Sequence, residues 1–250
     1  MHYKHLTLFL TTIVVIALAS CHNEKKSEKR SDTSSTMVTT TDTTAPTKTG
    51  NAETTEQIND SCIGRYFTVD TVSDSLWNMM QNNNIVDRTE LRRIRVLHWD
   101  SDNKTHQGEM ICHRSIADTL IYIFRELYKA KYPIQRIVPA HRYSNDDEKQ
   151  MQDNNTSCYS PRTVKGTTVM SKHACGLAVD LNPLYNPYYR ARKNGSPDVL
   201  PHTATPFVDR EKDFSYKIDH NDLAYKLFTS HGFRWGGDWK SCKDYQHFER

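Results

Sequence analysis

One stretch in the second half of the chain combines residue types that bind metal ions. "SKHACGLAVDLN", residues 171–182, places His173 and Asp180 seven residues apart with a glycine between them. Imidazole and carboxylate groups are common zinc ligands. On one straight strand these two side chains would point in opposite directions, so we expect Gly176 to bend the backbone and bring them together. The alternative is a surface strand with an isolated carboxylate and a histidine in the preceding loop.

The C-terminal stretch "RWGGDWKSCKDYQHFER" adds a second pair, because Asp244 lies three residues before His247. Two histidines and one carboxylate form a recurrent catalytic zinc set, in which water takes the fourth position. Asp244 is then a candidate general base for that water rather than a further ligand, which would close the open position. An isolated Asp–His pair with this spacing is weak evidence for a metal site. The half-site at His173 and Asp180 strengthens it.

Three motifs in a fixed order carry a family resemblance. They are SxHxxGxAxD at 171–180, WGGDW at 235–239 and DxxHF at 244–248. Together they resemble the D-alanyl-D-alanine carboxypeptidase and L-alanyl-D-glutamate endopeptidase family, zinc peptidases of the lysostaphin/D-Ala-D-Ala/sonic hedgehog type. The ordered motifs span roughly residues 142–249. The segments "GEMICHRSIADTLIYIFRELYKAKYPI" and "DDEKQMQDNNTS" extend the similarity to about residue 90.

The resemblance implies one zinc ion bound by His173, Asp180 and His247, with Asp244 as general base. Related carboxypeptidases commonly have glutamate at the base position. An aspartate there is similar to the endopeptidase-like members, so the bond that is cleaved stays open. The implied function is hydrolysis of peptidoglycan stem peptides, either as a D-Ala-D-Ala carboxypeptidase or as an L-Ala-D-Glu endopeptidase.

The family also uses an upstream arginine to hold the substrate. Arg142, in "PAHRYSNDDEKQ", matches that place best, and Arg162 is the rival because it lies nearer to His173 in the sequence. A guanidinium group can form two parallel hydrogen bonds with a carboxylate, which lysine cannot. The alternative for either residue is a solvated surface arginine.

The two tryptophans of the WGGDW motif have two interpretations. Trp235 and Trp239 are more typical of a hydrophobic core than of a platform for substrate. Asp238, between them, could orient a ligand histidine through its free ring nitrogen. Ser171 is expected in a turn or beside a ligand rather than as a nucleophile.

Two other function classes remain open from the sequence. One is a catalytically inactive, zinc-containing lipoprotein that binds the cell wall. The complete set of three ligands and a base argues against it. The other is a purely structural zinc domain, but structural sites are usually closed by four protein ligands and rich in cysteine. No CxxC pair occurs here.

The first 58 residues differ from the rest of the chain. Residues 1–20 have a lysine followed by a short apolar run, as in a secretory signal peptide. The run ends in Leu-Ala-Ser before Cys21, which resembles a bacterial lipobox and predicts a lipid on that cysteine. Residues 21–58 are rich in Ser and Thr and predict a disordered tether. These features predict a lipid-anchored protein of the bacterial cell envelope, outside the cytoplasm, with a peptidase domain over residues 59–250.

Charge and cysteine content limit the partners. The net charge of +3 is too small to indicate nucleic acid binding. We also expect the protein to be a monomer. An exported protein can form disulfides, but five cysteines remain beside Cys21, so at least one stays unpaired within the chain. Their pairing is open: Cys62, Cys112, Cys158, Cys175 and Cys242.

The patterning predicts an α+β fold, a single domain with a central antiparallel sheet flanked by helices and the zinc site on the sheet. "LRRIRVLHW" and "GEMICH" predict a hairpin around a turn at 100–108. Ser115 is a candidate cap for the following helix. Further elements are a helix over 74–81, a strand at "IQRIV" and a helix over 219–230. The helix that follows Ser115 has one apolar face: Ile116, Leu120, Ile123, Phe124 and Leu127.

Overall fold

A computed structural model of the chain describes residues 63–80, 85–164, 166–193 and 195–250. They belong to the unit that runs from Thr55 to Arg250. The predicted signal peptide, Cys21 and its tether, and Cys62 lie outside the described residues. None of the helices in the described ranges has the length and apolar content needed to span a membrane.

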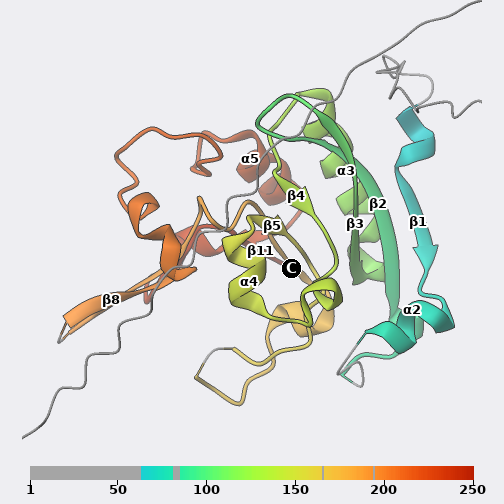
Figure 1. The fold of residues 1–250 in the computed structure, drawn as a ribbon, viewed down its shortest axis with the longest axis horizontal. Helices are drawn as coiled ribbons and strands as arrows, with labels where there is room; N and C mark the ends of the chain where they lie inside the picture. The colour runs from blue at the N-terminus through green and yellow to red at the C-terminus, as the bar shows by residue number, and fades with distance from the viewer. Residues whose placement is uncertain (1–62, 81–84, 165, 194) are drawn as a thin grey trace, which may run out of the picture. The chain divides into compact units, whose positions relative to one another are not determined.

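An antiparallel sheet and one long helix form the first half of the described structure (Figure 1). The sheet has the order β1 (Thr68–Thr71), β2 (Leu91–Trp99), β3 (Thr105–His113). The predicted hairpin is therefore confirmed, although β3 begins inside the stretch predicted as turn. Helix α3 (Arg114–Lys129) packs against all three strands.

Helix α3 begins two residues earlier than the predicted cap requires. The imidazole of His113 caps it by accepting a hydrogen bond from the Ser115 backbone N–H at 3.2 Å. Ser115 is thus inside the first turn, and the predicted cap is wrong by two residues. The apolar face is confirmed because all five of its members are at most 1% exposed: Ile116, Leu120, Ile123, Phe124 and Leu127.

A second antiparallel sheet carries the C-terminus. Its order is β6 (Ala178–Asp180), β11 (His247–Glu249), β9 (Arg234–Trp235). Helix α5 (Leu223–Ser230) contacts β9 and α3, so the two sheets share one hydrophobic core. This core covers one side of β6 and β11 and leaves their other side for polar groups.

Helix α5 is shorter than predicted. The Asp222 side chain caps it by accepting hydrogen bonds from two backbone N–H groups, so residues 219–222 precede the helix. Phe228 is fully buried in the core, whereas Leu223, at the first position of the helix, is 37% exposed. Gly232 follows the helix with φ +84°, the left-handed conformation expected after a helix end.

The third sheet has the order β10 (Lys243–Asp244), β7 (Tyr188–Arg192), β8 (Gly195–Leu200). Figure 1 shows the β7–β8 hairpin reaching away from the rest of the described unit. Two short strands, β4 (Arg136–Ile137) and β5 (Asn155–Thr156), pair in parallel. The "IQRIV" segment therefore contributes only two strand residues.

Short helical segments connect these sheets. The α-helices are α2 (Asp74–Met79) and α4 (Asp147–Gln152). Residue 81, the predicted end of α2, is outside the described ranges. The 3-10 helices are η1 (Gly64–Tyr66), η2 (Arg88–Glu90), η3 (Ala140–Tyr143), η4 (Lys172–Cys175), η5 (His202–Phe207) and η6 (Gly236–Asp238).

The α+β class is confirmed, but the single central sheet is not found among the described residues. They form three three-stranded antiparallel sheets and a two-stranded parallel one. The physical reason is strand length: after β3, the strands have two to six residues and are separated by turns. Such short strands cannot align into one continuous ladder.

Candidate functional site

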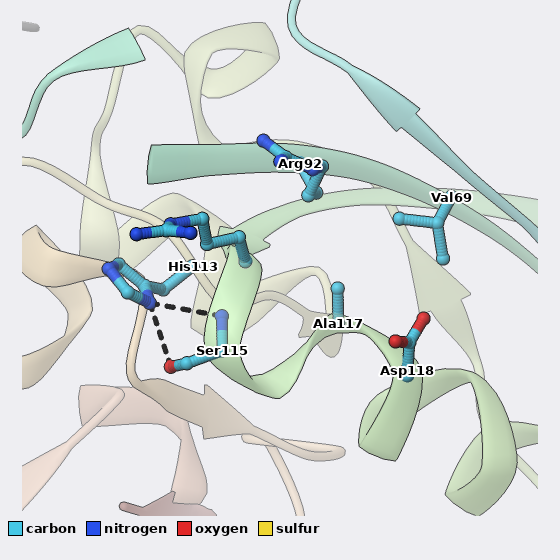
Figure 2. A pocket seen from close by; sticks show the side chains of 7 residues that line it. Val69, Arg92, His113, Ser115, Ala117 and Asp118 are labelled. Carbon is cyan, nitrogen blue, oxygen red and sulfur yellow. Dashed lines mark hydrogen bonds between the residues drawn. The ribbon is translucent and has the colours of Figure 1, made fainter. Parts of the chain in front are cut away.

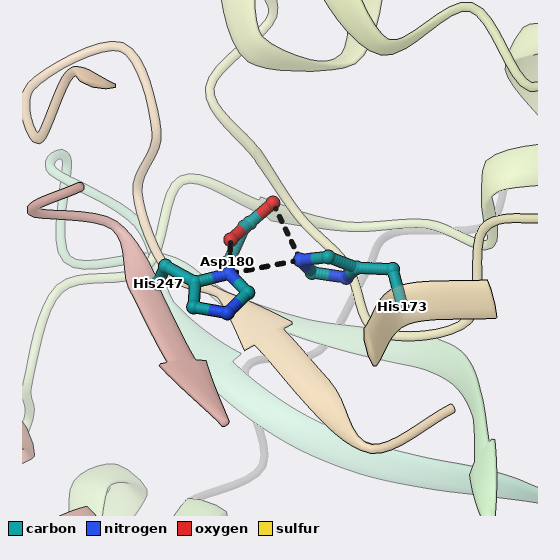
Figure 3. A group of neighbouring side chains, drawn as sticks. All are labelled: His173, Asp180 and His247. Atoms are coloured by element: carbon teal, nitrogen blue, oxygen red, sulfur yellow. Dashed lines mark hydrogen bonds and ion pairs between the residues drawn. The ribbon is translucent and has the colours of Figure 1, made fainter. Parts of the chain in front are cut away.

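Three side chains meet on the polar side of the β6–β11 pair (Figure 3). His173 Nε2 lies 3.1 Å from Asp180 Oδ2, and His247 Nδ1 lies 3.1 Å from Asp180 Oδ1. The two imidazole nitrogens are also 3.1 Å apart. All three residues are buried. One ligand atom from each residue lies within 4.8 Å of the other two, close enough to share one metal ion.

Strand register and one bend position the three residues. Asp180 and His247 are direct partners across β6 and β11, and directly opposite side chains lie on the same face of a sheet. His173 is in η4, which ends at Gly176 with φ +68°. A Cβ at Gly176 would lie 2.7 Å from the His113 backbone nitrogen. Only glycine fits this tight, left-handed turn, and the predicted bend is confirmed.

The far ring nitrogen of each histidine has a partner of its own. His173 Nδ1 donates to the Cys158 carbonyl at 2.7 Å, which leaves Nε2 directed at the cluster. His247 Nε2 lies 3.4 Å from Glu249 Oε2, which leaves Nδ1 for the cluster. Arg234 in turn holds Glu249 through a 2.7 Å contact. Such outer partners set the tautomer and orientation of metal-binding histidines.

The orienting carboxylate is therefore not the one predicted. Asp238 accepts from His220 Nε2 at 2.7 Å and is exposed, so its predicted role with a ligand histidine is wrong. Glu249 was missed in the sequence, although a signal was present. It stands two residues after His247, and alternate residues of a strand share a face.

The electrostatics of the cluster favour a cation. Burial opposes ionisation of Asp180, but the two histidines outweigh it and hold the pKa of this carboxyl below its ordinary value. Burial likewise opposes a charge on His247, whereas Asp180 and Glu249 raise its pKa to about 10. The carboxylate thus needs a positive partner, and a metal ion can replace the proton on the imidazole.

The donor set fits zinc. Two imidazole nitrogens and one carboxylate are a recurrent three-ligand set that leaves a coordination position open. No other group of three histidine, cysteine or carboxylate side chains within metal-sharing distance occurs in the part of the chain that the structure describes. Cys175, two residues after His173 in sequence, is not a member of the group.

Asp244 lies at the edge of the cluster on β10. Burial, aided by the charge of Asp180, raises the pKa of its carboxyl to about 7, while His247 and Arg162 oppose this rise. Its Oδ1 is buried and has no hydrogen-bond partner among the described residues. Gly236 allows the approach, because a Cβ there would lie 2.6 Å from the Asp244 carbonyl oxygen. A carboxyl with a pKa near neutrality and an oxygen that has no hydrogen-bond partner suits a general base.

The structure separates the two candidate arginines. Arg162 Nη2 lies 3.7 Å from Asp180 Oδ2, and its Nε lies 3.1 Å from Asp147 Oδ1 on α4. Arg142 is in η3, is exposed, and forms no ion pair with a described residue. Arg162 is therefore the arginine that lies at the cluster. Contact with α4, fifteen residues earlier, could not be inferred from its sequence position.

The two tryptophans have different environments. Trp235 is 4% exposed and belongs to the core, as the more typical interpretation predicted. Trp239 is half-buried, and its ring centroid lies 5.2 Å from that of His247. Trp239 thus forms a wall beside the cluster. Ser171 accepts from the His173 backbone N–H at 3.2 Å, in the predicted role of a turn residue.

A pocket of about 470 Å³ lies at the start of α3, between that helix and β1–β2 (Figure 2). Its two arginines already have partners. Arg92 Nη1 donates to two backbone carbonyls, and Arg114 Nε donates to Glu90. None of the residues of the metal cluster lines this pocket, so it is separate from the candidate site.

Comparison with known proteins finds a family match in the segment that contains the metal cluster. Residues 165–250 match the family model described as D-alanyl-D-alanine carboxypeptidase. This confirms the family resemblance over these residues, and its predicted extension to about residue 90 stays a prediction. The matched segment contains His173, Asp180, Asp244 and His247 and does not extend to Arg142 or Arg162. No curated protein and no solved structure matches the chain.

Proposed function

We propose that the chain is a zinc peptidase that hydrolyses peptidoglycan stem peptides at the cluster of His173, Asp180 and His247, because residues 165–250 match the family model described as D-alanyl-D-alanine carboxypeptidase. The observation that carries the proposal is the position of Asp244. A half-buried aspartate with a raised carboxyl pKa and a buried, unpartnered Oδ1 lies beside a three-ligand metal set. A structural zinc site has no use for such a base.

Each residue has a separate role in the proposed reaction. His173, Asp180 and His247 would hold one zinc ion, which when bound polarises a carbonyl and lowers the pKa of water. Asp244 accepts the proton of the attacking water at Oδ1 and then gives it to the leaving amine. The reaction thus consumes one water and releases a free carboxylate and a free amine.

We assign the substrate-holding role to Arg162 rather than to Arg142. Its guanidinium lies at Asp180 and is fixed by Asp147, so it is near the reacting atoms before substrate binds. It can donate to the carbonyl or carboxylate oxygen of the substrate. Trp239 would limit access of water on the His247 side.

Two bonds fit this chemistry. A D-Ala-D-Ala carboxypeptidase would release one terminal alanine, and an L-Ala-D-Glu endopeptidase would cut after the first alanine of the stem. The aspartate at the base position is similar to the endopeptidase-like members, whereas the matched family description names the carboxypeptidase.

We also propose the predicted location. A lipid on Cys21 and a tether over residues 21–58 would hold the domain at the cell envelope, outside the cytoplasm, within reach of peptidoglycan. A catalytically inactive wall-binding lipoprotein is the alternative. It would keep the three ligands but would not need the raised pKa of Asp244.

Mass spectrometry of defined muropeptides incubated with the zinc-loaded chain tests the function. Loss of a single terminal alanine identifies the carboxypeptidase, and release of the stem beyond its first L-alanine identifies the endopeptidase. Intact muropeptides, with zinc present in the protein, would contradict the proposal and favour the binding lipoprotein.

A further inference from the structure

Strand β7 pairs with the strand that carries the candidate base Asp244. Away from the site, β7 carries positively charged side chains. Asp244 on β10 is the direct partner of Tyr188 on β7. Directly opposite residues of an antiparallel pair place their side chains on the same face. The face of β7 that begins at Tyr188 therefore adjoins the reacting centre rather than a remote surface.

Arg190 is the next side chain on that face. Alternate residues of a strand point the same way and are about 7 Å apart. The electrostatic surroundings of the Tyr188 hydroxyl agree with this placement. Burial and then Cys242 raise the pKa of Tyr188, and the positive charge of Arg190 and the negative charge of Asp244 both act on it. Arg190 and Asp244 are thus both close enough to Tyr188 to influence its charge.

The charge of Arg190 is available to a ligand. The residue is exposed and forms no ion pair with any residue in the described ranges. Its cross-strand partner Asp198 instead contacts Arg192, with Nη2–Oδ1 at 2.6 Å and Nε–Oδ2 at 2.9 Å. Asp198 on β8 therefore forms its ion pair with Arg192.

We propose that Arg190 and Tyr188 form a specificity subsite for a carboxylate of the peptide substrate, close to the bond that is cleaved. The inference rests on the proposed function and names a feature of its substrate. A peptide that places its reacting carbonyl beside Asp244 and runs along β7 brings its next side chains to Arg190. A guanidinium selects a carboxylate there by charge and by paired hydrogen bonds. Stem peptides with free carboxylates would be preferred to the same peptides with amides.

The test compares one muropeptide in two forms, with free stem carboxylates and with those carboxylates converted to primary amides. The full-length, zinc-loaded chain is assayed beside Arg190→Gln, Arg190→Lys and, as the matched control, Lys193→Gln at the exposed end of the same hairpin. Arg190→Gln should raise KM for the carboxylate form about fivefold, the size of an exposed ion pair, and leave kcat unchanged. KM for the amide form should not change, and Arg190→Lys should recover part of the loss.

Equal effects of Arg190→Gln on both forms, no effect on either, or the same effect from Lys193→Gln would overturn the inference. Failure of the parent chain to cleave either form would instead contradict the proposed function. In that case, calorimetric binding of the two muropeptides to the parent and to Arg190→Gln still decides the inference. A preference for the carboxylate form that disappears in the variant supports it, and no preference in the parent refutes it.

Discussion

His247 and Glu249 stand two residues apart on β11, with His247 Nε2 3.4 Å from Glu249 Oε2. This contact occupies the ring nitrogen that faces away from Asp180 and so commits Nδ1 to the metal cluster. A carboxylate behind a metal-binding histidine fixes the ring and raises its basicity. The last strand of the chain thus supplies a ligand and the group that orients it.

Replacing Glu249 should weaken zinc binding without removing a ligand. Glu249→Gln keeps the shape of the side chain but loses the charge that holds His247, so zinc affinity should fall about 10- to 100-fold. Competition with a chelator of known affinity measures this. Asp238→Asn is the matched control, because Asp238 contacts His220 instead, and its zinc affinity should equal that of the parent. Equal affinities for all three proteins would refute the orienting role.

The two arginines should differ in their effect on catalysis. Arg162→Gln removes a cation fixed 3.7 Å from Asp180, and kcat/KM for muropeptide hydrolysis should fall about 100-fold, as for the loss of one oxyanion donor. Arg142→Gln changes an exposed residue and should stay within twofold of the parent. The reverse order would return the role to Arg142.

Asp244→Asn should separate metal binding from catalysis. The amide has nearly the same size but cannot accept the water proton, so kcat should fall by a factor of about 100 to 10,000. Zinc content per chain, measured by atomic emission, should be unchanged, since Asp244 is not a member of the ligand group. Parent-like turnover in this variant would mean that another group is the base.

Gly176 should tolerate no side chain. Gly176→Ala places a Cβ 2.7 Å from the His113 backbone nitrogen at a positive φ, and the free energy of unfolding should fall by about 1–3 kcal/mol. Urea denaturation measures it. Gly64→Ala is the control, because nothing lies within 4 Å of its added Cβ. If both variants lose the same stability, the close approach at Gly176 is not the cause.

His98 should make the protein sensitive to acid. It is 4% exposed, its Nδ1 donates to the Ile134 carbonyl at 2.7 Å, and burial lowers its pKa to about 4. In the unfolded chain its pKa is about 6.5, so between pH 6.5 and 4 the unfolded state binds more protons. Stability from this group is present above pH 6.5 and is lost as pH falls toward 4, by up to about 3 kcal/mol.

Urea denaturation across that pH range checks the effect of His98. His98→Gln should be less stable at pH 7 but lose less stability on acidification than the parent. His202→Gln changes an exposed histidine and should retain the pH dependence of the parent. An unchanged pH dependence in His98→Gln would show that the acid sensitivity arises elsewhere.

The parts of the fold that could be predicted from sequence are those that local patterns determine. Helix α3 has an apolar face at helical spacing, and the β2–β3 hairpin has two adjacent strands of nine residues. The cap of α3 was misplaced because His113, the last residue of a strand, performs a role usual for serine. The short strands after β3 have too few residues for a period to be visible.

The same distinction holds for the candidate site. His173, Asp180, Asp244 and His247 stand in compact motifs, so they could be named before the structure was known. The contact of Arg162 with Asp180 and Asp147 joins α4, a loop and β6, and such contacts between distant segments leave no periodic signal. The placement of Arg190 two residues along β7 from Tyr188, the partner of Asp244, likewise depends on the β7–β10 register.

The central claim is that the cluster of His173, Asp180 and His247 is a catalytic zinc site. The most direct measurement is zinc content and muropeptide turnover in one preparation, before chelation, after chelation and after zinc is restored. We predict that turnover disappears with the metal and returns in proportion to zinc, reaching its full value at one ion per chain. Turnover that persists without zinc, or a fully zinc-loaded chain that cleaves no muropeptide, would contradict the account.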